Sequence, residues 1–457
     1  MTQQSRPRKR PFNWQKFFTR IGLWLVALLS ACFIMPSPYI YRILPANPAF
    51  GLAEAYQNPQ LAQLSGASWQ RIRLHWGWIQ PNNANEWVEF EIRDAEIDHE
   101  VAAQREMVAL LQGIPAWGKG TDGLPLGLWL PDDDPQNLWA QWVRTAATRY
   151  QGKIRHWIVW NEPEIWQTDH PAYSWHGTVA DFAQLQKVSY RVLKRVDASN
   201  QVFLPGYSHH WDAEYGRPAY LRLLLDELAK DPQAGIYNQY FDHFTFNLYF
   251  NPEGNYQILK DWRDWLTTQG YTQSHWLMET NAPPSDDPRY PVPDAQFKVS
   301  LQEQAAYIPQ MLALSLVLGL ERSEVYVLLD PAFGADPEPF GLARRDGTTR
   351  PAFRSFQTAT HLLSEVQSAT LQKSWPYWWV TLDQPDRITH VLWTRTTEPL
   401  EVELPATKKL GMQTDVWGHS EWIWTDGHLR LVTLPPAECS NDPCFIGGMP
   451  VYIVEWK

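Results

Sequence analysis

Two glutamates in this sequence follow short apolar runs and could together carry out acid and base chemistry. Glu162 comes just after the run 157–160, and Glu279 comes just after the run 276–278. Runs rich in aromatic and β-branched residues predict buried strands, so each carboxyl group is expected where a strand ends. Cleavage of a glycosidic bond needs such a pair, because one carboxyl group protonates the departing oxygen while the other attacks the anomeric carbon or activates water.

The residues beside Glu162 suit this chemistry. Pro163 disfavours the α region for Glu162, so the strand is expected to end where a side chain can project into a cleft. Asn161 offers a neutral donor for a sugar hydroxyl. For the tripeptide Asn-Glu-Pro alone, the alternative is a surface turn that follows a core strand.

From about residue 48 to 365, short apolar runs alternate with amphipathic stretches, which predicts a parallel sheet wrapped by helices. Helices are predicted at 178–196, around 258–265, at 300–318 and after Pro351. Eight predicted strands in a stretch of this length favour an α/β fold, a (β/α)8 TIM barrel. These strands are 49–53, 70–76, 107–111, 154–160, 201–205, 243–249, 275–279 and 325–329.

In such a barrel, reactive side chains lie at the carboxyl ends of the strands. Glu162 and Glu279 fall at the ends of the fourth and seventh predicted strands. Both carboxyl groups are therefore expected at the same mouth of the barrel.

After residue 370 the sequence changes to short β-rich runs separated by turn formers. These runs predict a C-terminal all-β domain, a β-sandwich packed on the barrel. Its predicted strands are 377–382, 388–394, 400–404, 429–434 and 451–455. The chain is thus expected to have three parts, which are a leader with an apolar export or anchor segment (1–36), a catalytic barrel (37–369) and a β-sandwich (370–457).

With glutamates at the ends of its fourth and seventh predicted strands, the chain resembles the clan A glycoside hydrolases, and its trailing β domain resembles family 39 and its relatives. The resemblance implies a retaining double displacement on a carbohydrate substrate, which uses no cofactor and no metal. It also implies that Glu162 is the acid/base, that Glu279 is the nucleophile, and that Asn161 contacts the hydroxyl next to the anomeric carbon.

Further site residues follow from the resemblance. Arg73 matches the second-strand arginine that braces the nucleophile as a carboxylate, so it should lower the pKa of Glu279. A drier setting should raise the pKa of Glu162, which gives one base and one acid near neutral pH. Tyr249 matches a tyrosine whose hydroxyl lies near the nucleophile, whereas Asn247 stands where many relatives have histidine.

Aromatic residues and histidines near strand ends are candidates for contacts with a sugar, because flat rings pack against the C–H faces of sugar rings. A core or loop position is the alternative for each, and most of the 26 tryptophans are expected in the core. The candidates are His75, Trp78, Trp117, Trp166, His209, His210 and Trp211.

Other acidic residues are given structural or surface roles. Glu164 lies beyond the strand end and is expected to be structural or to lie at the rim. The acids at 132–134 and 286–287 are interpreted as solvated loop residues, with calcium binding as the alternative.

The charge distribution separates the leader from the rest of the chain. The formal net charge is −11, although residues 1–20 carry six basic residues and no acid. An acidic body does not favour nucleic acid as a partner. The sequence makes no prediction about the oligomeric state.

The basic leader is followed by the apolar segment 21–35, and together they predict export. Three outcomes stay open, namely an uncleaved membrane anchor, a lipoprotein with Cys32 as its lipidated residue, and a freely secreted protein. Cys439 and Cys444 predict a small disulfide loop on an exported chain, with metal binding as the alternative.

The sequence therefore predicts an exported, extracytoplasmic, membrane-tethered retaining glycosidase that acts on a β-linked glycan or glycoside. One alternative is a non-catalytic glycan-binding surface protein that kept the barrel. Another is a transglycosylase, which shares the covalent intermediate and differs in how well the cleft excludes water. Two carboxyl groups together with Asn161 and Arg73 favour catalysis, because binding alone would not require this set.

Overall fold

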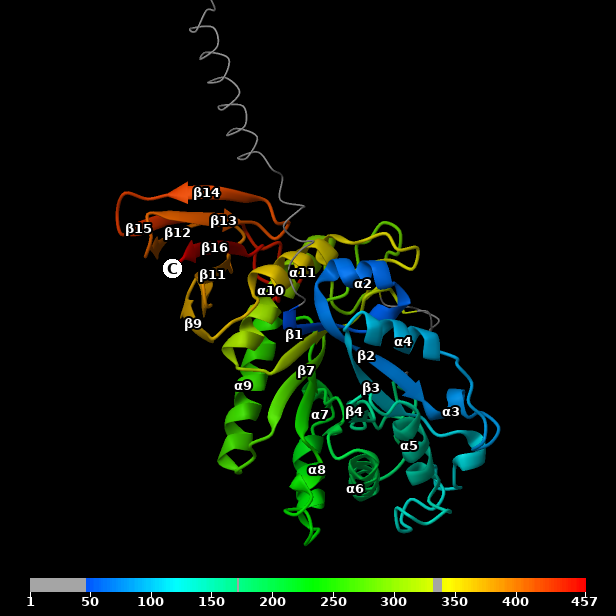
Figure 1. Cartoon of the computed structure of the whole chain (residues 1–457). Helices are drawn as coiled ribbons and strands as arrows, with labels where there is room; N and C mark the ends of the chain where they lie inside the picture. Colours follow the sequence, from blue (N-terminus) through cyan, green and yellow to red (C-terminus); the bar gives the residue numbers. More distant parts are fainter. Residues whose placement is uncertain (1–46, 171, 332–338) are drawn as a thin grey trace, which may run out of the picture. The chain divides into compact units, whose positions relative to one another are not determined.

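The computed structural model describes residues 47–170, 172–331 and 339–457 (Figure 1). Within these residues, the first eight strands form a closed barrel in chain order, and β8 pairs in parallel with β1. The predicted (β/α)8 barrel is therefore confirmed. Its strands are β1 (Asn47–Leu52), β2 (Ala67–His75), β3 (Glu106–Gln112), β4 (His156–Val159), β5 (Gln201–Phe203), β6 (His243–Asn247), β7 (Ser274–Thr280) and β8 (Arg322–Val325).

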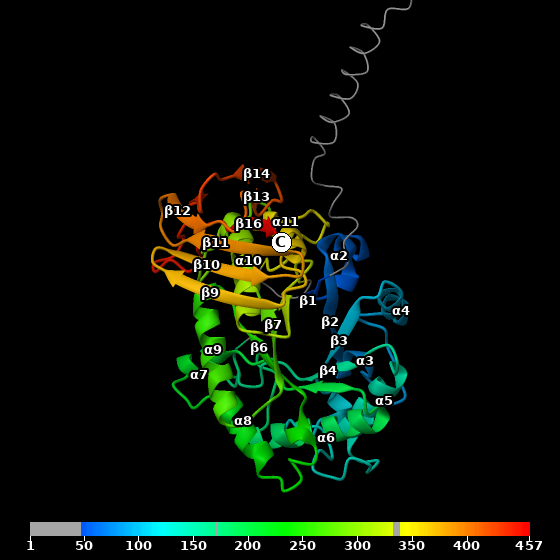
Figure 2. The same cartoon turned by 60° about the vertical axis from the view of Figure 1, so that its left-hand side comes forward.

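Helices lie outside these strands, as Figures 1 and 2 show for α5, α6, α8 and α9. The helix predicted after Thr178 is confirmed, and its capping box joins Thr178 and Asp181 through reciprocal hydrogen bonds of 2.9 and 3.2 Å. The longer helices are α2 (Pro59–Ser65), α4 (Asp94–Ala102), α5 (Leu138–Arg149), α6 (Val179–Val196), α8 (Tyr220–Ala229), α9 (Pro252–Thr268), α10 (Leu301–Val317) and α11 (Pro351–Leu362).

Large side chains fill the interior of the barrel. The rings of Trp69 and Trp276 meet edge to face with centroids 5.2 Å apart. This layer makes the barrel a packed core rather than a pore, so a ligand is confined to the carboxyl ends of the strands. The cluster contains Trp69, Val108, Leu110, Ile158, Phe203, Trp276 and Met278.

The eighth strand differs from its prediction. It runs from Arg322 to Val325, whereas the sequence predicted 325–329. The strand contains Ser323 and Glu324, which are polar yet buried. Because the prediction relied on apolar runs, it began the strand three residues too far along the chain.

The C-terminal region is all-β, as predicted. Its six-stranded sheet has the order β14-β13-β16-β11-β10-β9, and β12 pairs with β15 in a second sheet. Leu392 and Ile453 of the large sheet pack against Val402 and Val432 of the small sheet, so the two sheets form a sandwich. The strands are β9 (Ser368–Ser374), β10 (Tyr377–Asp383), β11 (Arg387–Thr394), β12 (Leu400–Pro405), β13 (Leu410–Thr414), β14 (Ser420–Trp424), β15 (Leu429–Leu434) and β16 (Val451–Trp456).

The other face of the large sheet shares a core with the barrel. Val380, Val391 and Tyr452 belong to the same buried cluster as the barrel helices. The side-chain amide of Gln310 on α10 donates to the carbonyls of Gly447 and Gly448, each at 3.0 Å. The exact domain boundaries stay a prediction, with β9 beginning two residues before the predicted start of the sandwich.

The predicted disulfide between Cys439 and Cys444 is present. The predicted leader at 1–36 lies outside the described residues. In the part of the chain that the structure describes, no helix combines the length and apolar character needed to cross a bilayer.

Two of the acids predicted to be solvated are instead buried. Asp132 pairs with Arg191 at 2.7 Å and with Arg195 at 3.0 Å. Asp287 is fully buried and pairs with two arginines of the segment before α11. The interpretation failed at these positions because the arginine partners come from distant parts of the chain.

Candidate active site

The end of β4 places Glu162 on a constrained backbone. Trp160 and Glu162 have φ angles of +70° and +46°, in the left-handed region that such residues rarely adopt. The N–H of Glu162 donates to the carbonyl of Gly206 at 2.9 Å, which ties it to the segment after β5. Glu162 is thus outside the right-handed α region, as its following proline predicted. Strain held in place by a neighbouring segment is typical of functional sites.

Glu279, near the end of β7, is buried and has a donor at each carboxyl oxygen. Nη1 of Arg71 lies 2.5 Å from Oε1 of Glu279. The hydroxyl of Tyr249 donates to Oε2, as the resemblance implied for this tyrosine. A cation and a hydroxyl aimed at the two oxygens suit a carboxylate that acts as a nucleophile.

The predicted contact between Arg73 and Glu279 is wrong, because Arg71 occupies that position. Arg73 instead pairs with Glu91 at 2.8 Å and with Glu54 at 3.5 Å. The two arginines are two residues apart on β2, so they project from the same face of the strand. Arg71 lies one pleat deeper in the barrel, which is the level of Glu279.

Glu162 is half-buried and lies close to the negative charge of Glu279. Nδ2 of Asn247, on β6, donates to Oε1 of Glu162 at 2.9 Å. Burial and then the negative charge of Glu279 raise the pKa of Glu162 to about 8, against the opposing effects of the Asn247 hydrogen bond and the charge of Arg71. A carboxyl group with a pKa raised this far keeps its proton at neutral pH.

Asn161 is held so that its own donors stay available. Its Oδ1 accepts from Nδ2 of Asn247 at 3.1 Å. Among the described residues, its Nδ2 donates to no side chain or carbonyl group. This amide can therefore donate to a ligand hydroxyl beside Glu162.

Two further buried glutamates support the site. Glu164 is fully buried and accepts from the N–H of Ser208 at 2.6 Å, which agrees with a structural role. Glu324 accepts from the N–H of Arg71 at 2.6 Å, and burial raises its pKa to about 8. Glu324 therefore helps to hold the arginine that contacts Glu279.

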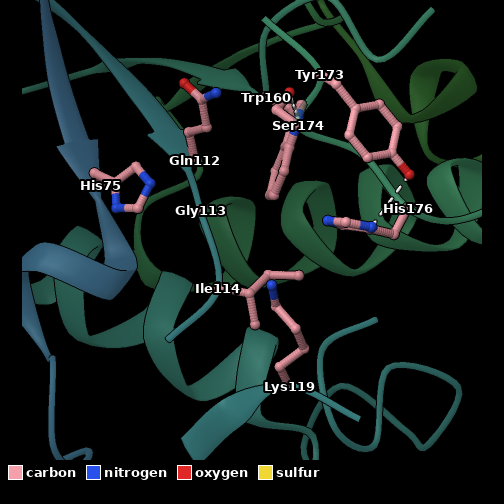
Figure 3. Close-up of a pocket in the computed structure, with 9 residues that line it drawn as sticks. All are labelled: His75, Gln112, Gly113, Ile114, Lys119, Trp160, Tyr173, Ser174 and His176. Atoms are coloured by element: carbon pink, nitrogen blue, oxygen red, sulfur yellow. Dashed lines mark hydrogen bonds between the residues drawn. The ribbon is translucent and has the colours of Figure 1, made fainter. Parts of the chain in front are cut away.

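A cavity of about 290 Å³ lies at the ends of β2 and β3 and next to Trp160, which follows β4 (Figure 3). His75 lines it, as predicted for a cleft residue, together with Gln112, Lys119 and Trp160. The ring of His75 stacks on Trp78 with centroids 4.1 Å apart, so Trp78 supports the cavity wall.

The other predicted cleft residues make contacts elsewhere, and none of them is among the residues that line this cavity. Trp117 donates to the carbonyl of Gln80, and Trp166 is exposed under the guanidinium of Arg217. His209 accepts from Trp262 at 3.3 Å. His210 contacts the hydroxyl of Ser208, and Trp211 stacks on Tyr215. In the described ranges, no group of three or more His, Cys, Asp or Glu side chains is placed to hold a metal ion.

Sequence reasoning missed Arg71 and Glu324, and it noticed Asn247 only as a departure from a pattern. Arg71 could have been found, since it shares a strand face with Arg73 in the motif Arg-Ile-Arg. Glu324 gave no signal, because a lone glutamate in a polar stretch resembles a surface residue.

Solved structures of several enzymes share this architecture over most of the chain. A family 39 glycoside hydrolase from the gut symbiont Bacteroides cellulosilyticus has a TM-score of 0.66 and 15% identity, covering 91% of this chain and 81% of that chain. The fold is that of the clan A glycoside hydrolases. The clan A resemblance inferred from the sequence is thus confirmed for the fold.

Two other solved structures match this fold over almost the whole length of their own chains. A monomeric β-xylosidase from Caulobacter crescentus has a TM-score of 0.58 and 15% identity, covering 90% of this chain and 96% of that chain. A family 30 endoxylanase from Clostridium papyrosolvens has a TM-score of 0.57 and 10% identity, covering 90% and 97%. No protein-family model matches the sequence, and no curated protein sequence matches it. The fold alone does not determine the chemistry, which depends on the side chains at the mouth of the barrel.

Proposed function

We propose that this protein is a retaining glycoside hydrolase that cleaves O-glycosidic bonds of β-linked glycans or glycosides. The observation that carries the proposal is the contrast between two carboxyl groups at one mouth of the barrel. Glu279 is ion-paired with Arg71, whereas the pKa of Glu162 is raised to about 8. One group is suited to attack and the other to donate a proton.

The proposed reaction has two steps. Glu162 protonates the glycosidic oxygen while Glu279 attacks the anomeric carbon, which breaks the bond and leaves a covalent glycosyl-enzyme. Glu162, now a carboxylate, then takes a proton from water as that water attacks the same carbon and releases Glu279. The free amide of Asn161 is placed to donate to the neighbouring hydroxyl, where the hydrogen bond strengthens in the transition state.

The names of the fold neighbours support β-linked substrates, since they include a β-xylosidase and an endoxylanase. A protein that only binds glycans would need neither a protonated Glu162 nor an ion-paired Glu279. Transglycosylation would use the same two residues, so the ratio of hydrolysis to transfer products separates it from hydrolysis.

The test is a screen of chromogenic β-xylosides, β-glucosides, β-galactosides and α-L-iduronides with the wild type and with Glu279→Gln. The wild type should release chromophore from at least one glycoside, and Glu279→Gln should lower kcat by at least about 10⁴-fold. Glu401→Gln, on an exposed position of β12, makes the same chemical change and should retain full activity. Equal turnover by wild type and Glu279→Gln would contradict the proposal.

We also propose that the protein is exported and tethered to a membrane through its N-terminal segment. The basic leader and apolar run support export, and the disulfide in the C-terminal region supports an oxidising compartment. Fractionation of expressing cells tests this, because a wholly soluble protein with reduced cysteines would contradict it.

A further inference from the structure

Three successive strand ends contribute residues to the cavity. His75 is the last residue of β2, Gln112 is the last residue of β3, and Trp160 directly follows β4. These positions share the mouth of the barrel with Glu162, which lies two residues beyond Trp160. A volume of about 290 Å³ is at the low end for small-molecule sites, so it suits one sugar residue and its substituent.

The charge of this cavity is unlike that of the whole chain. None of its lining residues is acidic, and Lys119 supplies a positive charge, although the chain carries a formal net charge of −11. Lys119 forms no ion pair with any carboxylate of the described ranges. In Figure 3 its side chain points toward the space between Ile114, Trp160 and His176.

A second donor in the cavity is also unused. The side-chain amide of Gln112 makes no hydrogen bond to another described residue. Lys119 and Gln112 both line the cavity, and in Figure 3 the amide of Gln112 points away from the ammonium group of Lys119. The ammonium group is therefore the donor that can hold an anion in the space between Ile114, Trp160 and His176.

Two histidines also line the cavity, namely His75 and the exposed His176. Burial, and then the charges of Arg73 and Lys119, lower the pKa of His75 to about 4. Burial and then Lys119 also lower the pKa of His176, whose Nδ1 lies 3.1 Å from the hydroxyl of Tyr173. At neutral pH both histidines are therefore neutral, and the charge that a ligand meets in the cavity is that of Lys119.

We propose that this cavity binds the anionic substituent of an acidic sugar, a carboxylate or a sulfate ester, through Lys119. The inference rests on the proposed function and narrows its substrate class to acidic glycans. The cavity opens at the ends of β2 and β3, at the same mouth of the barrel as Glu162, so the acidic sugar is the one cleaved or its neighbour.

The test compares kcat/KM for 4-nitrophenyl β-D-glucoside, its 6-sulfate and 4-nitrophenyl β-D-glucuronide. The wild type should prefer one of the two acidic substrates, which identifies sulfate or carboxylate as the group bound. Lys119→Met should lower kcat/KM for that substrate by about ten- to a hundredfold and leave the neutral glucoside unchanged. Lys119→Arg should retain most of the preference.

The matched control is Lys409→Met, which removes the charge of an exposed lysine next to β13. It should leave all three values unchanged. Two results would overturn the inference and leave the proposed function standing. The first is hydrolysis of the glucoside with no preference for either acidic substrate. The second is an equal loss of kcat/KM on all three substrates in Lys119→Met.

Calorimetric titration with D-glucuronate and D-glucose 6-sulfate separates the two proposals if none of the three glycosides is cleaved. Binding of either anion that is lost in Lys119→Met and kept in Lys409→Met would support the anion site while the proposed function fails. The absence of binding by both anions would overturn the anion site as well.

Discussion

Arg71 and Glu279 form an ion pair of 2.5 Å at the carboxyl mouth of the barrel. The pair is held from below, because the N–H of Arg71 donates to Glu324. Arg71 is nearly buried, so it can hold Glu279 in one position with little exchange for water.

Replacement of Arg71 by methionine should lower kcat/KM by about 10²- to 10³-fold, because it removes a charged donor from the attacking carboxylate. It should also lower the free energy of unfolding by about 3 kcal/mol or more, since Glu279 and Glu324 lose their cation. Kinetics and urea denaturation measure the two effects. Arg73→Met is the matched variant and should change kcat/KM by less than about tenfold. A larger effect at Arg73 than at Arg71 would show that the wrong arginine has been placed beside the nucleophile.

The activity should fall at alkaline pH as Glu162 loses its proton. The pKa of this carboxyl group is raised to about 8, so the group is protonated and able to act as the acid below that pH. The plot of kcat/KM against pH should therefore show a basic limb near pH 8. Glu162→Gln cannot titrate, and its residual activity on a dinitrophenyl glycoside, whose leaving group needs no acid, should lack that limb. If kcat/KM of Glu162→Gln still fell near pH 8, the titrating group would be a residue other than Glu162.

Asn247 is a positioning residue that should affect the pH at which the activity falls, because it contacts Glu162. Its amide donates to Glu162 and favours the ionised form, so Asn247→Ala should raise the pKa of Glu162 further and move the basic limb to higher pH. Asn200→Ala is the control, because Asn200 is also a buried asparagine but lies before β5 at the opposite end of the barrel. It should lower stability and leave the pH profile in place. A basic limb that stays fixed or moves to lower pH in Asn247→Ala would contradict this role.

Much of the barrel could be predicted because its strands are apolar runs whose ends are marked by polar or turn-forming residues. Seven of the eight strands lie at or within a few residues of their predicted positions, and the helix after Thr178 begins where its capping residue indicates. In the C-terminal region, three strands were not predicted, namely β9, β13 and β14. β14 is an edge strand whose side chains are mostly exposed, and β9 forms the opposite edge of the large sheet. β13 lies between β14 and β16, but Gly411 interrupts its alternation.

The sequence predicted which residue types form the candidate site, but not how deep in the barrel each side chain lies. The alternation of a strand places Arg71 and Arg73 on one face, yet it cannot tell which of them reaches Glu279, because that depends on how β2 and β7 are staggered across the barrel. Cavity residues such as Lys119 come from loops whose course the strand pattern does not determine. The sequence also did not predict the buried ion pairs of Asp287, because its arginine partners lie 57 and 63 residues away along the chain.

Asp287 should contribute to stability rather than to catalysis. Its carboxylate accepts from Nε of Arg350 at 2.7 Å and from Nε of Arg344 at 2.9 Å, and Arg350 is also buried against Asp330. Asp287→Ala leaves buried guanidinium groups without their partner, so it should lower the free energy of unfolding by about 3 to 5 kcal/mol. The exposed Asp294→Ala should change it by less than about 0.5 kcal/mol. Denaturation curves compare the two, and similar midpoints would contradict a structural role for the network.

The covalent intermediate is the most direct test of the central claim. Incubation with a 2-deoxy-2-fluoro glycoside of the sugar that the wild type hydrolyses should add one fluorosugar to the protein, and peptide mass spectrometry should locate it on Glu279. The same treatment of Glu279→Gln should add nothing. A label on any other residue, or inactivation without a covalent adduct, would contradict the assignment of Glu279 as the nucleophile of a retaining glycosidase.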